Sequence, residues 1–494
     1  MTTTGETNTA PPTSRYRLAG HWREARPEQE LKVLSPVDGS AVGSVHEFTV
    51  AEVDEVFAAA RRARGAWAAR PLTERTGLLH RFADLLAQNA DPIARVLTME
   101  IAKPCNDAKD EVVRSADYIR HTAEDALRLV GETQFSDAFP GQARNKLAIA
   151  HRVPVGTVLA IPPFNYPVNL AVSKIAPALA TGNAVVLKPP SHGALSALMM
   201  CELAYQVGIP PTVLQAVTGR GSRIGDHLVT HAGVDLITFT GSSGTGTALA
   251  RKAGMVPLLL ELGGKDPAIV LDDADVEAAA ADIVSGAFAY SGQRCTAVKR
   301  VLVTRVVADD LVAAIVRRTA RLTVGDPRDN ARITPLVDPE AAAEAERMTK
   351  DAEAAGAVVV HGGGREGNLM RPTVVDHVTE DMDLAWVEPF APVLPVIRVG
   401  SAAEAVRLAN RSEYGLQAAV FTCDIDMAIQ LAARLDVGTV QVNGRTARGP
   451  DHFPFLGTKA SGMGTQGVRP SIEAMTRVKS LVVNLREKDL GGRT

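Results

Sequence analysis

Four short apolar stretches between residues 157 and 241 decide the fold: TVLAI at 157–161, NAVVLKP at 183–189, TVLQAV at 212–217 and VDLITFTG at 234–241. Their length and their β-branched residues predict buried strands. The segments between them predict helices over 165–181, 191–207 and 222–230. Strands that alternate with helices favour a parallel sheet covered on both faces. In such a doubly wound α/β fold, ligands bind beyond the carboxyl ends of the strands.

The chain on either side of this core continues the pattern. Upstream, alanine-rich stretches predict helices over 51–69, 72–89 and 105–130, and residues 143–159 predict two strands around Pro154. Downstream, a second α/β stretch from about 266 to 465 has predicted helices over 274–290, 308–321, 339–355 and 401–411. The last apolar strand, SLVVNL at 480–485, has no neighbour in sequence. We therefore expect it to dock on another sheet, which could belong to another subunit.

These patterns predict an α/β protein with a doubly wound parallel-sheet cofactor domain, a second α/β catalytic domain and a small β oligomerisation arm. At 494 residues, the chain is long enough for two or three packed units. The predicted divisions are a disordered tail over 1–14, a dinucleotide-binding domain over 15–130 and 155–262, a catalytic domain over 263–465, and an arm over 131–154 and 466–494.

The overall composition is that of an ordinary globular enzyme, with 46% hydrophobic and 22% charged residues. The 53 basic and 56 acidic side chains nearly cancel, which gives no reason to expect nucleic acid or an anionic membrane as a partner. The chain opens without a leader pattern, and no apolar run approaches the roughly 18 residues of a membrane span. The four cysteines form no CxxC pair, which indicates a reducing cytoplasm and neither a zinc nor a disulfide framework.

Cys295 lies in SGQRCT, just after a predicted helix ends at Ser291 and Gly292. We expect it in a loop, where the neighbouring Arg294 would favour the thiolate. A lone cysteine is more often a small buried hydrophobic residue, so this motif is weak by itself.

Glu261 ends the apolar run VPLLLE before two glycines, 34 residues ahead of Cys295. A carboxylate at the tip of a buried strand can act as a general base toward water if burial raises its pKa. The competing interpretation is a capping or ion-paired acid.

Asn165, in PPFNYP, lies between a predicted strand and a predicted helix. Its amide could donate to a developing oxyanion, a contribution of roughly 3 kcal/mol. The simpler interpretation is that it caps the helix.

Two further stretches suit a dinucleotide. Lys188 ends the strand NAVVLK, where many NAD-binding sheets place an acid; with Ser191 it suits a 2′-phosphate instead, although a solvated surface lysine is an equal alternative. FTGSSGTG at 239–246 predicts a strand, a glycine turn and a helix whose N-terminus could bind a pyrophosphate. The order of its glycines is not that of the usual fingerprint, so this signal is weak.

His227 and His231 lie at positions i and i+4 of a predicted helix, a spacing that metal ligands use. Because no acid completes an HExxH motif, surface histidines are the favoured interpretation. We expect no metal in this protein.

Six motifs, PFNYP, LKPPS, FTGSSGTG, LELGGKD, SGQRCT and EPFAPVLP, occur in the order found in the aldehyde dehydrogenase superfamily. The chain resembles that superfamily over roughly residues 30 to 485. Within it, the chain is most similar to the non-phosphorylating, NADP-dependent glyceraldehyde-3-phosphate dehydrogenases, through AYSGQRCTAVKRVLV, LTVGDP, RGPDHFPFLG and SIEAMTRVKS. The resemblance implies that Cys295 is the nucleophile, that Glu261 is the base for deacylation, and that Asn165 donates to the oxyanion beside the Cys295 amide.

The resemblance also implies an NADP site. Lys188 and Ser191 would bind the adenosine ribose and its 2′-phosphate, and Glu388 in WVEPF would hold the nicotinamide ribose. The other implied cofactor contacts are Gly225, Gly241, Ser242 and Gly246. The family usually has threonine where this chain has Ser191, which keeps a hydroxyl but leaves use of NAD possible.

The family's contacts to the substrate phosphate match Arg114, Tyr166, Arg294 and Arg448. Arginine suits phosphate because its planar fork can donate two hydrogen bonds at once. The implied reaction is the oxidation of D-glyceraldehyde 3-phosphate to 3-phosphoglycerate through a thiohemiacetal and a thioester on Cys295, without inorganic phosphate, in a cytoplasmic homodimer or homotetramer. The alternatives are an NAD(P)-dependent dehydrogenase of another aldehyde or semialdehyde and, more distantly, a catalytically silent dinucleotide-binding protein.

Overall fold

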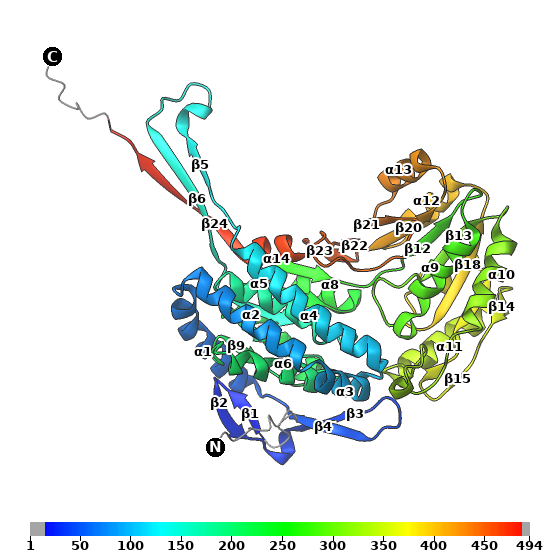
Figure 1. The fold of residues 1–494 in the computed structure, drawn as a ribbon, viewed down its shortest axis with the longest axis horizontal. Helices are drawn as coiled ribbons and strands as arrows, with labels where there is room; N and C mark the ends of the chain where they lie inside the picture. The colour runs from blue at the N-terminus through cyan, green and yellow to red at the C-terminus, as the bar shows by residue number, and fades with distance from the viewer. Residues whose placement is uncertain (1–14, 487–494) are drawn as a thin grey trace.

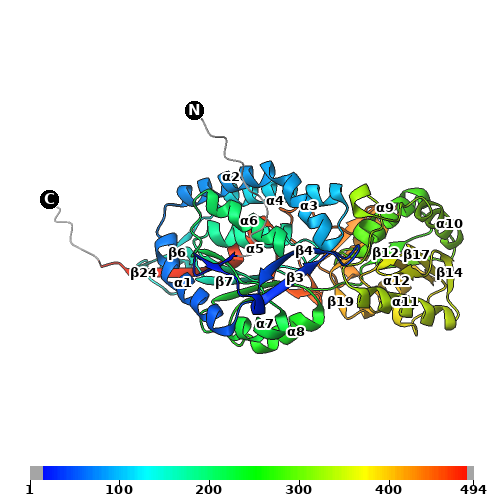
Figure 2. The same ribbon diagram turned by 90° about the horizontal axis from the view of Figure 1, so that it is seen from below.

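Two parallel sheets, each covered by helices on both faces, form two lobes that lie side by side (Figure 1, Figure 2). The structure is a computed structural model that describes residues 15–486. The predicted tail over 1–14 therefore lies outside the described residues. The predicted α/β class, with two parallel-sheet cores and a separate β arm, is confirmed.

The first sheet has six strands in the order β23-β11-β10-β7-β8-β9. Five of its strands run parallel: β7 (Thr157–Ile161), β8 (Ala184–Leu187), β9 (Leu214–Ala216), β10 (Leu236–Thr240) and β11 (Leu258–Glu261). The sixth, β23 (Gly462–Met463), pairs antiparallel with β11 and comes from far along the chain. All five carboxyl ends therefore meet at one edge of this sheet.

Helices cover both faces of this sheet because its strands are apolar on both sides. Val158 and Leu159, which are neighbours on β7, pack into two different buried clusters. One cluster includes α2 (Leu72–Gln88), α3 (Ala90–Ile101), α4 (Cys105–Ala126), α5 (Asn169–Ala180), α6 (Ala194–Gln206) and α14 (Val468–Ala474). The other includes α1 (Val50–Ala68), α7 (Gly221–Thr230) and α8 (Ser243–Lys252).

The second sheet has seven strands in the order β14-β17-β18-β13-β12-β20-β21. Its strands are β12 (Pro267–Val270), β13 (Arg300–Thr304), β14 (Val358–His361), β17 (Thr373–Asp376), β18 (Val393–Val399), β20 (Gln417–Phe421) and β21 (Thr439–Val442). All neighbours pair in parallel except β14 and β17. One face packs against α9 (Val276–Phe288) and α10 (Ala308–Thr319), and the other against α11 (Pro339–Ala354), α12 (Ala402–Arg411) and α13 (Ile425–Arg434).

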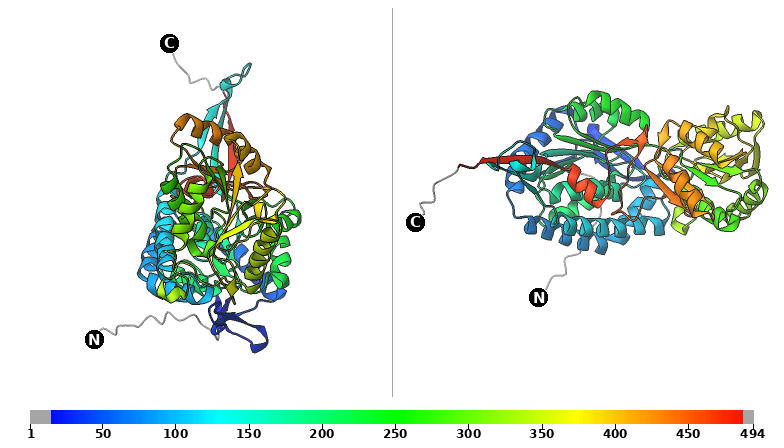
Figure 3. Two further views of the ribbon diagram at one scale, coloured as in Figure 1. Left: turned by 90° about the vertical axis from the view of Figure 1, so that its right-hand side faces the viewer. Right: turned by 90° about the horizontal axis from the view of Figure 1, so that it is seen from above.

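A three-stranded antiparallel arm projects from the first lobe (Figure 1, Figure 3). It consists of β5 (Glu132–Phe135), β6 (Lys146–Pro154) and β24 (Thr476–Asn484), with β6 in the centre. Several apolar side chains of β24 are exposed, among them Val478 at 61% and Leu481 at 54%. Smaller hairpins and pairs complete the chain: β1 (Arg15–Leu18) with β2 (His21–Glu24), β3 (Glu30–Leu34) with β4 (Ala41–His46), β15 (Arg365–Glu366) with β16 (Leu369–Met370), and β19 (Tyr414–Gly415) with β22 (Thr458–Lys459).

Two helices of the structure were not predicted: α3 over residues 90–101 and α13 over residues 425–434. The second segment of the arm was expected to begin at residue 466, but residues 468–474 form α14, whose Val468 and Ile472 are buried in the core of the first lobe. The strand of this segment begins at Thr476. These helices join the cores through partners distant in sequence, which local patterns do not reveal.

Candidate active site

The candidate site lies where the two sheets meet. Asn165, Lys188, Gly241 and Glu261 follow or end strands at the carboxyl edge of the first sheet. Lys299 and Glu388 precede β13 and β18 at the amino edge of the second sheet. Hydrogen bonds between the two lobes join these edges.

The predicted nucleophile and base lie next to each other. The Cys295 Sγ is 3.7 Å from Glu261 Oε1, in a geometry in which the thiol donates to the carboxylate. Cys295 is partly exposed, so it is not a sealed core residue. Burial, and then the negative charge of Glu261, raise the pKa of the Cys295 thiol to about 12. The expectation that Arg294 favours the thiolate is therefore wrong; its guanidinium donates to Thr296 Oγ1 at 3.3 Å.

A strained turn presents Cys295. Tyr290 and Ser291 have φ values of 49° and 54°, and Gly292 follows with φ 74°. Left-handed backbone is costly for residues other than glycine, so the surroundings must hold it. The Tyr290 hydroxyl donates to the Ile101 carbonyl at 2.7 Å, and the Ser291 hydroxyl to the Thr334 carbonyl at 2.8 Å. At Gly292 a Cβ would come within 2.4 Å of the Ala391 carbonyl oxygen, so only glycine fits.

Asn165 points from the first lobe to the nucleophile loop. It is buried, and its Nδ2 donates to the Gln293 carbonyl, two residues before Cys295, at 2.8 Å. The helix α5 begins only at Asn169, and Val168 is its N-cap residue. The interpretation of Asn165 as a helix cap is therefore wrong, and its amide faces the loop that carries Cys295.

One pocket holds the nucleophile, the carboxylate and all four expected phosphate contacts: Arg114, Tyr166, Arg294 and Arg448 line it together with Cys295 and Glu261. In this structure two of these arginines are paired with acids. Arg448 Nη1 lies 2.6 Å from Glu261 Oε2, and Arg114 Nη2 lies 2.6 Å from Asp451 Oδ1. The ion-paired interpretation of Glu261 thus also applies. The pocket has a free volume of about 40 Å³, which is enough for water.

The expected cofactor residues follow the carboxyl edge of the first sheet. Lys188 is 8% exposed, which excludes a solvated surface lysine, and its Nζ donates to the Pro189 carbonyl at 3.0 Å. Burial lowers the pKa of Lys188 to about 8. Ser191 follows three residues later on the same loop.

The expected phosphate-binding turn follows β10, which β7 separates from β8 in the sheet. Ser242 is the N-cap of α8, where its hydroxyl accepts from the Thr245 amide, and Gly241 precedes it. Gly246 is buried within α8, and a Cβ there would come within 2.3 Å of Leu262. Gly225 lies in α7 on the same face of the sheet.

Glu388 comes from the other lobe. Its carboxylate lies against the backbone of Gly263, where a Cβ would come within 2.3 Å of Glu388 Oε2. The expected cofactor contacts thus span both sides of the junction.

Comparisons with known proteins agree with this geometry. The model of the aldehyde dehydrogenase family matches residues 22–481. The chain belongs to this family. It is 51% identical to the NADP-dependent glyceraldehyde-3-phosphate dehydrogenase of Streptococcus equinus, over 96% of this chain and 99% of that protein. It is 50% identical to the enzyme of the same name from Triticum aestivum, over 95% of both. The crystal structure of NADP-dependent glyceraldehyde-3-phosphate dehydrogenase from Bacillus halodurans C-125 complexed with NADP has a TM-score of 0.94 and 52% identity, covering 96% of this chain and 99% of that one.

Sequence reasoning missed several buried lysines of this aldehyde dehydrogenase. Lys103 Nζ donates to the Asn165 carbonyl at 2.6 Å and pairs with Glu111. Glu111 in turn accepts from the amides of Val168 and Asn169 at 3.0 and 3.1 Å. This pair fixes the segment that carries Asn165. A lysine in an apolar segment is the only sequence signal that could have drawn attention to it.

Lys174 and Lys299 are two more. Lys174 is the one cation in the apolar helix α5, and its Nζ donates to Thr240 Oγ1 at 2.7 Å. Burial lowers the pKa of Lys174 to about 7, against the opposing effect of Glu261. Lys299 lies four residues after Cys295, beside the motif that drew attention to the nucleophile.

An acid lies beside His227 and His231, although no acid completes a metal-binding motif in the sequence. Asp54 of α1 lies 2.7 Å from His227 Nε2 and 3.2 Å from His231 Nε2. The Gly233 amide donates to His231 Nδ1 at 2.9 Å. A neutral His231 therefore carries its proton on Nε2 and donates it to Asp54. A metal ion at Nε2 would need a lone pair on this atom, and the proton occupies that position. The contacts are those of a hydrogen-bonded cluster.

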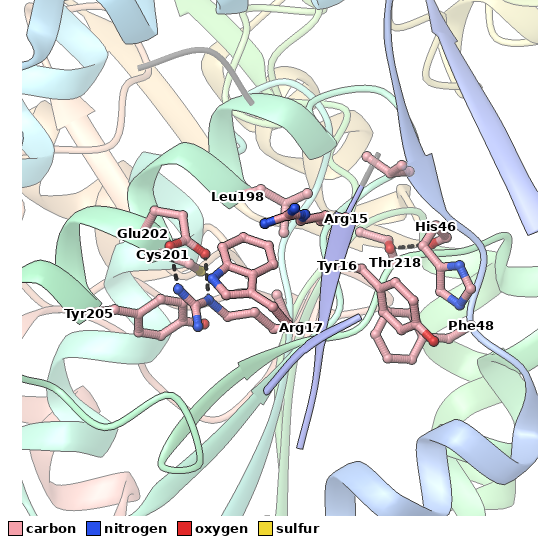
Figure 4. Close-up of a pocket in the computed structure, with 13 residues that line it drawn as sticks. Arg15, Tyr16, Arg17, His46, Phe48, Leu198, Cys201, Glu202, Tyr205 and Thr218 are labelled. Carbon is pink, nitrogen blue, oxygen red and sulfur yellow. Dashed lines mark hydrogen bonds and ion pairs between the residues drawn. The ribbon is translucent and has the colours of Figure 1, made fainter. Parts of the chain in front are cut away.

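A second pocket lies beneath the β1–β2 hairpin (Figure 4). Arg17 fills its centre: its guanidinium pairs with Glu202 at 2.8 and 2.9 Å and lies over the rings of Trp22 and Tyr205. The lining residues are different from those of the catalytic pocket. The ion pair between Arg17 of β1 and Glu202 of α6 anchors the hairpin to this helix. Within residues 15–486, no helix is both long and apolar enough to span a membrane.

Proposed function

We propose that this aldehyde dehydrogenase oxidises D-glyceraldehyde 3-phosphate to 3-phosphoglycerate with NADP, without inorganic phosphate. The observation that carries the proposal is the pocket in which Cys295 and Glu261 lie among three arginines and a tyrosine. Such a set of donors suits a phosphorylated aldehyde, because arginine forks match phosphate oxygens. The names of the relatives at about 50% identity support the same substrate and cofactor.

In the acylation step, Cys295 Sγ forms a bond to the aldehyde carbon. Because burial and the charge of Glu261, 3.7 Å away, keep the resting thiol neutral, the thiol proton passes to solvent before the thiolate attacks, and Glu261 stays deprotonated for the later hydrolysis. The carbonyl oxygen becomes an oxyanion that Asn165 Nδ2 and the Cys295 amide stabilise. The Asn165 amide has two donor hydrogens, and the bond to the Gln293 carbonyl uses only one of them. The arginines hold the phosphate and thereby orient the carbonyl.

The residues present fit NADP. Lys188 is a buried cation that pairs with no carboxylate of the described chain, so a 2′-phosphate would supply the missing anion. Ser242 and the N-terminus of α8 would hold the pyrophosphate, with Gly246 allowing close packing, and Glu388 would hold the nicotinamide ribose. When bound, the nicotinamide supplies the hydride acceptor that turns the thiohemiacetal into a thioester.

In the deacylation step, Glu261 removes a proton from water, and the resulting hydroxide adds to the thioester carbon. The Cys295 thiolate then leaves and the carboxylic acid is released. Arg448 connects the base with the phosphate site, because it pairs with Glu261 in this structure and is expected to bind the substrate phosphate. A bound phosphate would therefore compete for Arg448 and release Glu261.

The test is a panel of aldehydes, assayed with NADP or NAD and with or without coenzyme A. We expect kcat/KM for glyceraldehyde 3-phosphate to exceed that for glyceraldehyde by at least about a hundredfold, as expected for two or three charged hydrogen bonds of about 1.5–3 kcal/mol each. Equal values for the two aldehydes would contradict the phosphate assignment. A higher value for a semialdehyde would favour the other dehydrogenase, and no turnover of any aldehyde would favour the silent dinucleotide-binding protein.

The arm supports a homo-oligomer. β24 forms an edge of the arm, with Val478, Leu481 and Val482 all more than half exposed. An exposed apolar edge strand pairs readily with another chain, and β21 forms an exposed edge of the second sheet. Light scattering should give a mass of two or four chains, and Leu481→Lys should reduce it. A monomeric wild-type protein would contradict this assignment.

A further inference from the structure

Lys299 lies between the nucleophile loop and the carboxylate of Glu388. Its Nζ donates to the backbone carbonyl of Cys295 at 2.6 Å and lies 2.5 Å from Glu388 Oε1. The Lys299 side chain is only 3% exposed. A buried ammonium needs compensation from a charge and from hydrogen bonds, and here these two partners supply it.

The Glu388 carboxylate is fixed on both of its oxygens. Oε1 lies 2.5 Å from the Lys299 ammonium. Oε2 lies against Gly263, at the point where the chain leaves Glu261 for the second sheet. An ionised carboxylate has several lone pairs, so this pairing still leaves acceptor sites that a ligand hydroxyl can use.

We propose that Lys299 is a positioning residue with two contacts. It fixes Glu388 for the nicotinamide ribose, and it also holds the Cys295 backbone. The Lys299 ammonium then sets the distance between the Glu388 carboxylate and Cys295. The inference rests on the proposed function for the role of Glu388. It gives Lys299 no contact with the aldehyde.

The charge of Lys299 acts on the thiol as well. Around Cys295, Lys299 lowers the pKa of the thiol, while burial and the carboxylates Glu261, Glu388 and Asp266 raise it. The other cations near the thiol are Lys174 of α5 and the pocket arginines Arg114, Arg294 and Arg448. Removing Lys299 should therefore make the thiolate scarcer and the cysteine slower to react.

The experiment measures two quantities that need no aldehyde: the rate of Cys295 alkylation by iodoacetamide at pH 9, followed on the Cys295 peptide by mass spectrometry, and the Kd of NADP and of NAD. For Lys299→Met we expect alkylation about tenfold slower, which corresponds to about one pKa unit, and both Kd values about tenfold higher. Lys299→Arg should restore the alkylation rate to within about twofold. Lys299→Gln, which keeps a donor but no charge, should remain slow.

Lys265→Met is the matched control, because Lys265 is equally buried and donates to the Val387 carbonyl, without contacting Cys295. It should lower the melting temperature and leave the alkylation rate unchanged. If Lys299→Met or Lys299→Gln lowers the melting temperature in the same way with wild-type alkylation and Kd, Lys299 is merely structural and the proposal is wrong. Failure of the proposed function looks different: glyceraldehyde 3-phosphate is not oxidised, while the alkylation results stand.

Discussion

The first sheet presents the carboxyl ends of its strands to the site, whereas the second presents its amino ends. Asn165, Lys188 and Glu261 follow or end strands of the first sheet. Cys295 and Glu388 precede strands of the second. The two sheets share an architecture, so the difference comes from which edge is turned to the junction. In the proposed function, the first edge binds the dinucleotide and the second edge brings Cys295 to it.

The largest expected effect separates the two edges. Cys295→Ala should reduce kcat by at least about 10⁴-fold, because it removes the nucleophile. The Kd of NADP should change less than about twofold, since Lys188 and α8 lie on the other sheet. Steady-state kinetics and fluorescence titration measure the two effects. Cys423→Ala is the control, because that cysteine is exposed, and its activity should be unchanged.

Glu261→Gln tests the proposed general base, which the first sheet contributes to the reaction. Loss of the general base should lower kcat by about 10²–10⁴-fold and leave a burst of NADPH, because the thioester forms but hydrolyses slowly. Alkylation of Cys295 should become faster, since the Glu261 charge raises the pKa of the thiol. In the wild type the rate should rise about tenfold per pH unit between pH 7 and 10, below a pKa of about 12. Slower alkylation of the variant, or no burst, would contradict these roles.

Lys103→Met tests whether the first edge must be rigid to meet the second. The change leaves Glu111 buried without its partner, which should cost about 3–5 kcal/mol of unfolding free energy. We expect kcat to fall about tenfold, because the Asn165 segment loses its anchor. Urea denaturation and steady-state kinetics measure both. Adding Glu111→Gln should recover part of the stability; no recovery would mean that the pair is not the cause.

The smallest effect is confined to the first edge. Lys188→Met should raise the Kd of NADP about tenfold, or 1.4 kcal/mol, and leave that of NAD unchanged. The pKa of Lys188 is about 8 without cofactor, and a neighbouring phosphate should raise it. NADP binding should therefore take up protons between pH 8 and 10 and weaken as pH rises. Calorimetry in buffers of different ionisation enthalpy measures this; proton uptake with NAD as well would point to another group.

The sequence predicted the first edge better than the second. The strands with Lys188 and Glu261 at their ends were evident from apolar runs, and the parallel arrangement placed those ends together. Cys295 was recognisable from its motif, but the charge state of its thiol was not, because Glu261 and Lys299 act through space. The Lys103–Glu111 pair and the burial of α14 escaped prediction for a related reason. Their partners are known only once the chain has folded.

The left-handed turn over residues 290–292 limits how this enzyme can be re-engineered. Its backbone is held by side chains that never reach the pocket, so a library that randomises it would mainly sample misfolded proteins. Variation placed at Tyr166 or Arg294, on the pocket wall, leaves that scaffold intact. A programme to change aldehyde specificity should therefore keep Tyr290, Ser291 and Gly292 constant and diversify the wall around them.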